Sequence, residues 1–122
     1  MSVLVDTSVW VGHFKKKNPR LTQLLLSDLV LVHPFVLGEI ACGTPPNRAQ
    51  TLLDLKSLAY CKQATLEETI QMIGDHQLYG EGCGLVDLSL LASALITPQC
   101  LLWTQDRRLS RLAQSFGVGF AG

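Results

Sequence analysis

The sequence predicts an α/β fold built around a mainly parallel central sheet. Short apolar runs at residues 2–5, 29–32 and 100–103 are typical of buried strands, and longer segments with helical periodicity lie between them. Parallel strands need crossover connections, which are usually helices that cover both faces of the sheet. The 122 residues, of which 48% are hydrophobic and 16% charged, suit a single packed domain that spans residues 1–122.

The first half of the chain is expected to contain three strands and four helices. Short apolar runs define the strands, and apolar residues three or four positions apart define the helices. The elements are a strand at 2–5, a helix at 7–17, a helix at 21–26, a strand at 29–32, a helix at 34–41, a helix from 46 or 47 to 58, and a short strand at 59–62. Pro34 suits the first turn of its helix, where no backbone hydrogen bond is lost, and Gly43 and Pro45 end that helix.

The second half begins with a helix whose start is marked by a capping box. Thr65 and Glu68 have the spacing at which each side chain accepts a hydrogen bond from the backbone of the other, and this helix should reach Tyr79. The glycine-rich loop 80–84 lacks the lysine of a phosphate-binding loop and is expected to be a flexible connector. A helix at 85–96 that is buried on most sides, a strand at 100–103, an amphipathic helix at 107–116 and an edge strand at 118–120 complete the fold.

Charge is unevenly distributed along the chain, although the formal net charge is zero. A neutral protein does not bind nucleic acid by charge alone. No lysine or arginine occurs between Ala64 and Asp106, whereas basic residues cluster on either side of this segment. These clusters are either solvated helix faces or contacts for phosphate groups. The candidate substrate-binding residues are Lys15, Lys16, Lys17, Arg107 and Arg108.

Membrane proteins and disulfide-rich proteins are disfavoured by the sequence. No apolar run approaches the roughly 18 to 20 residues that a membrane-spanning helix needs, which indicates a cytoplasmic protein without a membrane partner. The four cysteines occur singly, so buried free thiols are expected, with disulfides or a zinc site as the alternatives. They are Cys42, Cys61, Cys83 and Cys100.

Four acidic residues that are far apart in the sequence are predicted to meet in one site. Asp6 and Asp106 each follow a predicted parallel strand, and open α/β sheets bind ligands beyond the carboxyl ends of their strands. Glu39 and Asp87 lie in otherwise apolar helices, where a charge needs a partner. Two carboxylates about 4 Å apart repel each other by about 4 kcal/mol at an effective dielectric constant near 20. A divalent cation would relieve this repulsion, and oxygen ligands favour Mg²⁺ or Mn²⁺ over zinc.

Each acid also has a purely structural interpretation. Asp6 and Asp106 each precede a predicted helix and can cap its N-terminus. Glu39 can face solvent, whereas Asp87 is harder to explain in this way because its helix has almost no polar face. Capping and cation binding are compatible, since a capping residue lies at the same edge of the sheet.

Two hydroxyl side chains accompany the acids that follow the strands. Ser8 lies two residues after Asp6, and Thr104 lies two residues before Asp106. Both are candidates for orienting a ligating carboxylate or a metal-bound water, and local turn or cap contacts are the alternative. The three histidines have no carboxylate or cysteine at ligand spacing and are assigned no chemistry.

The opening segment Val3-Leu4-Val5-Asp6-Thr7-Ser8-Val9-Trp10 resembles that of PIN domains, in particular the VapC toxins of bacterial toxin–antitoxin pairs. The remaining acidic positions of that family are matched in order by Glu39 in Gly38-Glu39-Ile40, Asp87 in Gly84-Leu85-Val86-Asp87-Leu88 and Asp106 in Thr104-Gln105-Asp106. The resemblance covers essentially the whole chain. It implies a PIN-like three-layer α/β/α sandwich.

The resemblance also implies an activity. A protein of this kind is a Mg²⁺-dependent endoribonuclease, or one that uses Mn²⁺, and it hydrolyses phosphodiester bonds of structured RNA such as tRNA or ribosomal RNA. Cleavage would leave a 5′-phosphate and a 3′-hydroxyl. Asp6, Glu39, Asp87 and Asp106 would be both the catalytic residues and the metal ligands, acting directly or through water.

The resemblance implies two protein partners as well. The chain would be the toxin of a type II toxin–antitoxin system, would form a homodimer, and would bind a cognate antitoxin protein whose tail covers the acidic site. An apolar groove beside the acids is expected to receive that protein. Candidate residues for the groove are Trp10, Phe14, Phe35 and Leu37.

Two other interpretations of the acidic residues remain open. The first is a catalytically inactive PIN-like module that binds RNA or protein without cleaving anything. The second is a phosphatase of the haloacid-dehalogenase type, which also carries an aspartate at the end of its first strand. Those enzymes have a second aspartate two residues later, where this chain has Ser8, so the sequence disfavours this interpretation.

Overall fold

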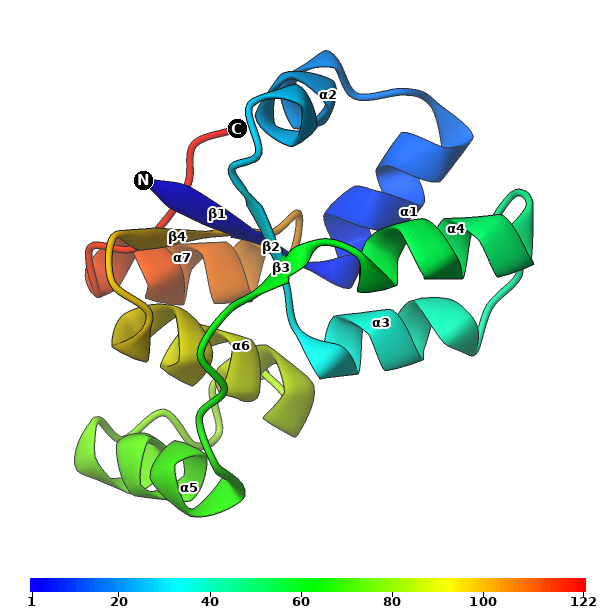
Figure 1. The fold of residues 1–122 in the computed structure, drawn as a ribbon. Helices are drawn as coiled ribbons and strands as arrows, with labels where there is room; N and C mark the ends of the chain where they lie inside the picture. Colours follow the sequence, from blue (N-terminus) through cyan, green and yellow to red (C-terminus); the bar gives the residue numbers. More distant parts are fainter.

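The computed structural model describes residues 1–122 and contains a four-stranded parallel sheet with seven helices around it (Figure 1). The elements are β1 (Ser2–Val5), α1 (Thr7–Lys15), α2 (Pro19–Leu26), β2 (Val30–Val32), α3 (Pro34–Ala41), α4 (Arg48–Lys56), β3 (Ala59–Tyr60), α5 (Leu66–Asp75), α6 (Leu85–Ile96), β4 (Cys100–Trp103) and α7 (Arg107–Ser115). The α/β fold class and the mainly parallel sheet are therefore confirmed.

The strand order β3-β2-β1-β4 places β1 in the interior of the sheet. Val3 of β1 pairs with Val30 of β2 on one side and with Leu101 of β4 on the other. The chain builds the sheet in one direction from β1 through β2 to β3, and then crosses back to add β4 on the far side of β1. Open α/β sheets bind ligands where the strand order reverses in this way, beyond the carboxyl ends of the strands.

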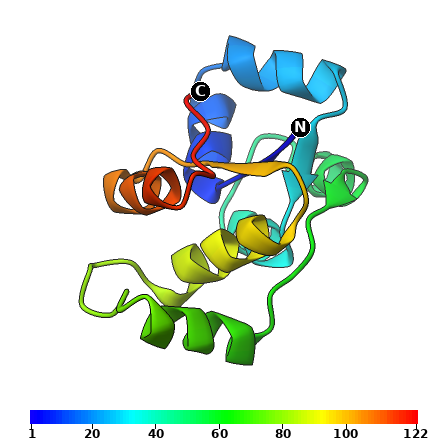
Figure 2. The same ribbon diagram turned by 90° about the vertical axis from the view of Figure 1, so that its left-hand side faces the viewer.

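Helices cover both faces of the sheet, as Figures 1 and 2 show. Helix α2 lies on one side, α6 lies on the other, and α5 packs on the outside of α6. Helix α3 packs against α1 and α4. This is the three-layer α/β/α sandwich that the resemblance implied. Its core is a cluster of 23 buried hydrophobic residues in which Val3, Leu4 and Val5 of β1 are completely buried.

Three helices end at least two residues earlier than the sequence predicted, and one of them is α4, which ends at Lys56 instead of residue 58. Helix α1 ends at Lys15 instead of residue 17, because Pro19 keeps Asn18 extended and the Asn18 side chain caps α2 by accepting from the backbone of Arg20 and Leu21. Helix α5 ends at Asp75 and does not reach Tyr79. The backbone of Gln77 is left-handed, and the N–H of Leu78 donates to the carbonyl of Ile73 in the manner of a Schellman motif.

Two predicted strands are shorter than expected or absent. Strand β3 comprises only Ala59–Tyr60 instead of residues 59–62. No regular strand forms at 118–120, so the prediction of an edge strand there is wrong. Gly119 forms only an isolated bridge with Leu102, in which Leu102 donates to Val118 and accepts from Phe120. This segment therefore lines the edge of β4 without adding a regular strand.

All four cysteines are free, as predicted, but only two of them are buried. Cys61 and Cys100 lie in the core, and burial raises the pKa of Cys61 to about 12. Cys42 is exposed after the end of α3, and Cys83 is half-buried in the loop before α6, so the prediction of buried thiols is wrong for these two. None of the helices combines the length and the apolar character needed to cross a bilayer.

Helix α6 makes a large contribution to the core, which yields a test of the fold. Leu90 is fully buried, so Leu90→Ala should lower the free energy of unfolding by about 3 kcal/mol through lost apolar burial and a residual cavity. Leu53 on α4 is 60% exposed, and Leu53→Ala should change stability by less than about 0.5 kcal/mol. Urea denaturation followed by circular dichroism measures both. Equal losses in the two variants would contradict this core.

Candidate functional site

The ends of β1 and β4 lie side by side at the carboxyl edge of the sheet. Asp6 directly follows β1, and its backbone N–H donates to the carbonyl of Trp103, the last residue of β4, at 2.9 Å. Asp106 follows three residues after Trp103 and precedes α7. Because the strand order reverses between β1 and β4, these two acids lie where an open α/β sheet binds its ligand.

Asp6 is a buried carboxylate held by two hydroxyl groups. Its side chain is only 6% exposed, and Oδ2 accepts hydrogen bonds from Ser8 Oγ at 2.7 Å and Thr104 Oγ1 at 2.8 Å. Asp6 occupies the N-cap position of α1, but its side chain forms no capping hydrogen bond. The capping interpretation therefore does not apply to this side chain, whose charge is directed into the site.

The two hydroxyls also tie the loop after β4 to Asp6. Ser8 Oγ accepts from the N–H of Gln105 at 3.0 Å, and Thr104 Oγ1 accepts from the N–H of Asp106 at 3.0 Å. Each hydroxyl thus accepts from the backbone and donates to the same carboxylate oxygen. This network fixes the orientation of Asp6 relative to the start of α7.

Asp106 and Glu39 are each held through one carboxylate oxygen. Asp106 Oδ1 accepts from the N–H of Leu109 at 2.9 Å, so Asp106 does cap α7, as one of its two interpretations predicted. Glu39 is exposed on α3, and its Oε1 accepts from Thr7 Oγ1 at 2.6 Å. Thr7 was not singled out from the sequence, because this contact depends on the packing of α1 against α3.

Asp87 lies in the first turn of α6 and is close enough to the other acids for their charges to shift its pKa. Its pKa is raised, first by burial and next by the charge of Asp6, with further contributions from Asp106 and Glu39. The backbone N–H of Gly84 acts in the opposite direction. The fold therefore places Asp6, Asp106 and Glu39 near enough to Asp87 for each of their charges to raise its pKa.

Cys83, in the loop before α6, lies beside the same region. The pKa of its thiol is raised by burial and by the negative charges of Asp87 and Asp106, and Arg108 offsets this only in part. A thiol with a raised pKa stays protonated at neutral pH and is a poor nucleophile. Cys83 therefore shows no sign of an activated thiolate.

The donor set fits a hydrated divalent cation. None of the hydrogen bonds to Asp6, Glu39 and Asp106 comes from a lysine or an arginine, so their negative charge has no cationic partner there. No group of three or more carboxylate, imidazole or thiol side chains is arranged to coordinate one ion directly. Mg²⁺ usually keeps several waters and is held by one or two protein carboxylates, which matches such a set of separated oxygens.

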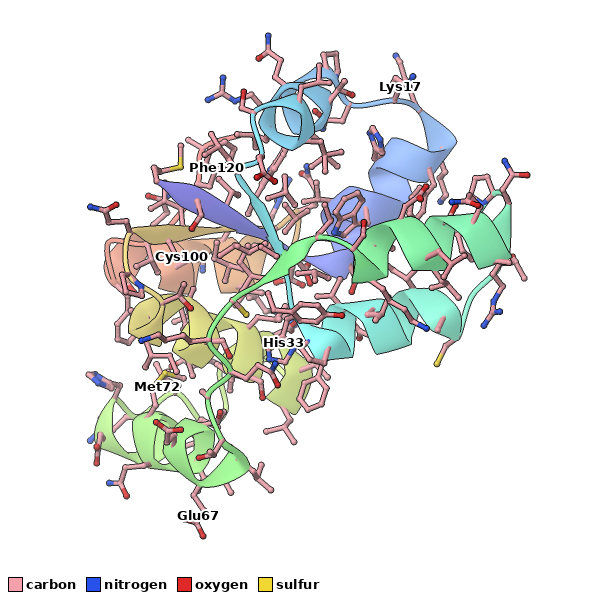
Figure 3. The ribbon with its side chains drawn as sticks, viewed as in Figure 1. Lys17, His33, Glu67, Met72, Cys100 and Phe120 are labelled. Atoms are coloured by element: carbon pink, nitrogen blue, oxygen red, sulfur yellow. The ribbon has the colours of Figure 1, made fainter.

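The predicted basic residues differ in their surroundings. Lys16 and Lys17 line a cleft of about 360 Å³ that also includes Gln105 and Ser8, whose hydroxyl donates to Asp6. Lys17 and the acidic Glu67 of α5 lie at opposite ends of the molecule (Figure 3). Lys15 and Arg107 are exposed, with no hydrogen bond to another residue. Among the predicted basic residues, Lys16 and Lys17 are therefore the two linked to Asp6, through the Ser8 that lines the same cleft.

Arg108 has a structural contact that was not expected from the sequence. Its Nη1 donates to the carbonyl of Gly82 at 3.4 Å, and a Cβ atom at position 82 would lie 2.8 Å from that nitrogen. Gly82 also has a φ of +86°, a conformation that glycine adopts without strain. The loop 80–84 is therefore packed against α7 at this point and is not simply a connector.

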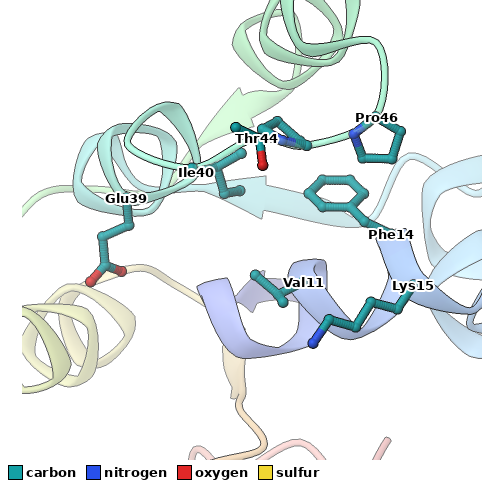
Figure 4. Close-up of a pocket in the computed structure, with 9 residues that line it drawn as sticks. Val11, Phe14, Lys15, Glu39, Ile40, Thr44 and Pro46 are labelled. Carbon is teal, nitrogen blue, oxygen red and sulfur yellow. The ribbon is translucent and has the colours of Figure 1, made fainter.

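An apolar groove begins at Glu39 and runs between α1 and the segment that follows α3. It has a volume of about 490 Å³ and is lined by Val11, Phe14, Lys15, Glu39, Ile40, Gly43, Thr44, Pro45 and Pro46. Figure 4 shows Val11 and Phe14 facing Ile40 and Pro46 across it. Phe14 was expected in such a groove.

The other three candidates for this groove do not line it. Trp10 is 3% exposed and belongs to the core, and Leu37 packs against the core. Phe35 is exposed outside the groove.

The raised pKa of Asp87 yields a prediction about stability. A carboxyl group whose pKa is higher in the folded than in the unfolded protein destabilises the fold at every pH above its ordinary pKa of 3.8, fully so once the pH exceeds the raised value. Asp87→Asn should therefore raise the melting temperature at pH 7 in the presence of a chelator, and the difference should shrink as the pH falls toward 4. Asp75→Asn, on the exposed end of α5, should show no such pH-dependent gain. A less stable Asp87→Asn protein at pH 7 would refute this view of the site.

Comparison with known proteins agrees with this architecture. The chain matches the model of the PIN domain family over residues 3–115, a span that includes all four acids. It is 37% identical over 119 residues to Ribonuclease VapC32 of Mycobacterium tuberculosis, from strain CDC 1551 / Oshkosh and equally from strain ATCC 25618 / H37Rv. Each alignment covers 98% of this chain and 96% of the relative. This chain therefore belongs to the PIN domain family.

Proposed function

We propose that this chain is a metal-dependent endoribonuclease that hydrolyses phosphodiester bonds in RNA. One observation supports the proposal: the charges of Asp6, Asp106 and Glu39 help to raise the pKa of Asp87 near the edge of the sheet where the strand order reverses, and none of the four carboxylates has a lysine or arginine partner. The relatives named Ribonuclease VapC32 support the choice of RNA as the substrate. Structured RNA such as tRNA or ribosomal RNA is the substrate that the family resemblance favours, and such a substrate would place the enzyme in the cytoplasm.

In the proposed mechanism, Asp6, Glu39, Asp87 and Asp106 hold one or two Mg²⁺ or Mn²⁺ ions, directly or through water. A bound divalent ion lowers the pKa of a water molecule and neutralises charge on the phosphate. Ser8 and Thr104 keep the Asp6 carboxylate in one orientation through their two hydrogen bonds. Hydrolysis by in-line attack of water on phosphorus would break the bond to the 3′ oxygen, which leaves a 3′-hydroxyl and a 5′-phosphate.

The RNA backbone would enter along the basic side of α1. The cleft that contains Lys16 and Lys17 also contains Ser8, whose hydroxyl donates to Asp6, so a phosphate in this cleft would lie next to the acids. Lys15, Arg107 and Arg108 are further candidates for phosphate contacts. Because Arg108 already donates to Gly82, we rank Lys16 and Lys17 above it.

We further propose that the chain is the toxin of a type II toxin–antitoxin pair. The resemblance to VapC toxins implies a homodimer and a cognate antitoxin protein. The apolar groove that runs from Glu39 past Phe14 to Pro46 is suited to an apolar segment of that antitoxin, since its first residue, Glu39, is one of the four acids. An occupant of this groove would block access to Glu39.

A catalytically inactive PIN-like module is the second candidate. It is favoured by the absence of any three side chains arranged to coordinate one ion directly. Such a protein would bind RNA equally well with and without divalent ions and would cleave nothing. The phosphatase alternative would instead release phosphate from a small phosphomonoester. The cleavage experiment below separates the nuclease from these two alternatives.

The proposed activity is tested by incubating the purified chain with total RNA in Mg²⁺, in Mn²⁺ and in a chelator. Cleavage should require the divalent ion. Asp6→Asn should lower the rate by more than about 100-fold, because even groups that only orient a metal ligand often contribute up to about 100-fold. Asp75→Asn is the matched control, since Asp75 is exposed on α5 and far from the site, and it should cleave at the wild-type rate. Wild-type protein that cleaves no RNA in either ion would refute the nuclease.

The proposed path of the RNA is tested by the salt dependence of binding in a chelator, where no cleavage occurs. Each phosphate contact contributes about 0.7 to the slope of log affinity against log salt for single-stranded nucleic acid. Replacing both Lys16 and Lys17 by alanine should therefore reduce this slope by about 1.4. The exposed pair Lys56 and Lys62, replaced in the same way, should leave it unchanged. Fluorescence anisotropy with a labelled RNA measures the slope, and an unchanged value in the first variant would exclude this path.

A further inference from the structure

Helix α1 contains a glycine that the fold itself does not require. Gly12 is exposed inside this helix, where glycine is less favourable than alanine because it loses more backbone entropy on folding. Its φ is not positive, since the glycines with positive φ are Gly80, Gly82 and Gly117. A Cβ atom at position 12 would also meet nothing within 4 Å. Neither the backbone conformation nor the packing of the protein therefore explains a glycine here.

Gly12 differs from the two comparable glycines of the molecule because it lines a cleft. Gly38 of α3 and Gly74 of α5 are likewise exposed inside helices, and a Cβ atom at either position would have open space around it. Neither of them lines a cleft. Gly12 lines the cleft of about 360 Å³ that also contains Ser8 and the two lysines of the proposed RNA path. The open space beside Gly12 is therefore the space that a bound strand would occupy.

The position of Gly12 along α1 places it between these lysines and the acids. Ser8, Gly12 and Lys16 follow one another at intervals of four residues, which puts them on the same side of the helix at steps of about 6 Å. Lys16 is the C-cap residue, and its backbone N–H donates to the carbonyl of Gly12 at 2.9 Å. At the other end, Ser8 Oγ donates to Asp6. A strand that runs along this cleft from Lys16 to Asp6 therefore passes over Gly12.

The polar groups of the cleft suit an anionic strand. No carboxylate lines the cleft, and its polar side chains are Ser8, Lys16, Lys17, Asn18 and Gln105. Positive side chains without neighbouring carboxylates attract phosphate groups. Glycine is in turn a residue found where a ligand approaches a backbone closely, because it has no Cβ atom. The lysines and the bare backbone at Gly12 thus fit one occupant, a phosphodiester chain.

We propose that Gly12 is a substrate-contacting residue, whose lack of a side chain lets the phosphodiester backbone of RNA lie against α1 between the lysines and Asp6. This inference rests on the proposed function of the chain as a ribonuclease. A side chain at position 12 would lift the strand off the helix and so lengthen its distance to both Lys16 and Ser8. The stability that α1 loses by having a glycine is accordingly balanced by access for the substrate.

The test measures the binding of a labelled RNA in a chelator, by fluorescence anisotropy, for Gly12→Ala and Gly12→Leu. Gly12→Ala should raise the melting temperature, because alanine favours the helix, and yet it should weaken RNA binding. Gly12→Leu should weaken binding by roughly tenfold or more, because its larger side chain fills more of the cleft. It should also reduce the dependence of affinity on salt, since the strand loses contacts with the lysines. A loss of affinity that accompanies a gain in stability cannot result from unfolding.

Two controls separate a contact with the strand from a general effect on the protein. Gly74 is the matched glycine on α5, and Gly74→Ala should raise the melting temperature while Gly74→Ala and Gly74→Leu both leave RNA binding unchanged. In a background with Lys16→Ala and Lys17→Ala, Gly12→Leu should cause a much smaller further loss, because the strand no longer follows this cleft. An equal loss in both backgrounds would show that position 12 acts independently of the lysines, which would overturn the inference.

The outcomes distinguish this inference from the proposed function itself. If the wild type cleaves RNA in Mg²⁺ or Mn²⁺ and Gly12→Leu binds RNA as tightly as the wild type, the nuclease stands and the role of Gly12 is refuted. If Gly12→Leu loses RNA binding but the wild type cleaves nothing in either ion, the nuclease fails and the contact at Gly12 stands. A wild type that binds no RNA in the chelator would overturn the inference whatever the cleavage result. Should circular dichroism show that Gly12→Leu does not fold, Gly12→Ala decides by the same criteria.

Discussion

The buried charge of Asp6 is the constraint on which the functional end of this molecule depends. A carboxylate that is only 6% exposed is tolerated when hydrogen-bond donors replace the lost water, and Ser8 and Thr104 are those donors. Thr104 can reach Asp6 only because β4 is paired in parallel with β1, which follows from the late return of the chain to the far side of its first strand. The pairing of β1 with β4 therefore brings Thr104 close to Asp6. The hydroxyls of Thr104 and Ser8 then stabilise the buried charge of Asp6.

Around Asp6 the fold accumulates negative charge that it does not neutralise. Asp87 projects from a helix whose other residues are mostly core, and both burial and the neighbouring acids raise its pKa. Unfavourable electrostatics of this kind are common at functional sites, where the stability of the core compensates for them. Here the fully buried Val3, Leu4 and Val5 of β1 and the mostly buried helix α6 contribute that stability. The same two elements thus anchor the interior and carry two of the four acids.

Sequence patterns predicted the architecture well where burial alone determines an element. The bounds of α6 and β4 match the apolar runs that predicted them. All four acids of the candidate site were singled out from the sequence, two because they follow strands and two because they lie in apolar helices. The C-terminal ends of helices α1 and α5 were predicted too far along the sequence, because Asn18 caps the following helix and Gln77 has a left-handed backbone. The contacts of Thr7 with Glu39 and of Arg108 with Gly82 join elements that only tertiary packing brings together. Trp10 was wrongly expected to line the apolar groove, because helical periodicity alone does not show which apolar residues of a helix remain exposed after packing.

The contact between Arg108 and Gly82 has a consequence for how freely this protein can change. Positions in exposed loops usually accept many residues, but at position 82 any side chain would both oppose the backbone conformation and displace the guanidinium group that holds the loop. That loop leads into the helix of Asp87, and Arg108 follows the cap residue Asp106 by two positions. A substitution at this exposed glycine would therefore strain the backbone of the loop that leads into the helix of Asp87, so the position tolerates fewer residues than its exposure suggests.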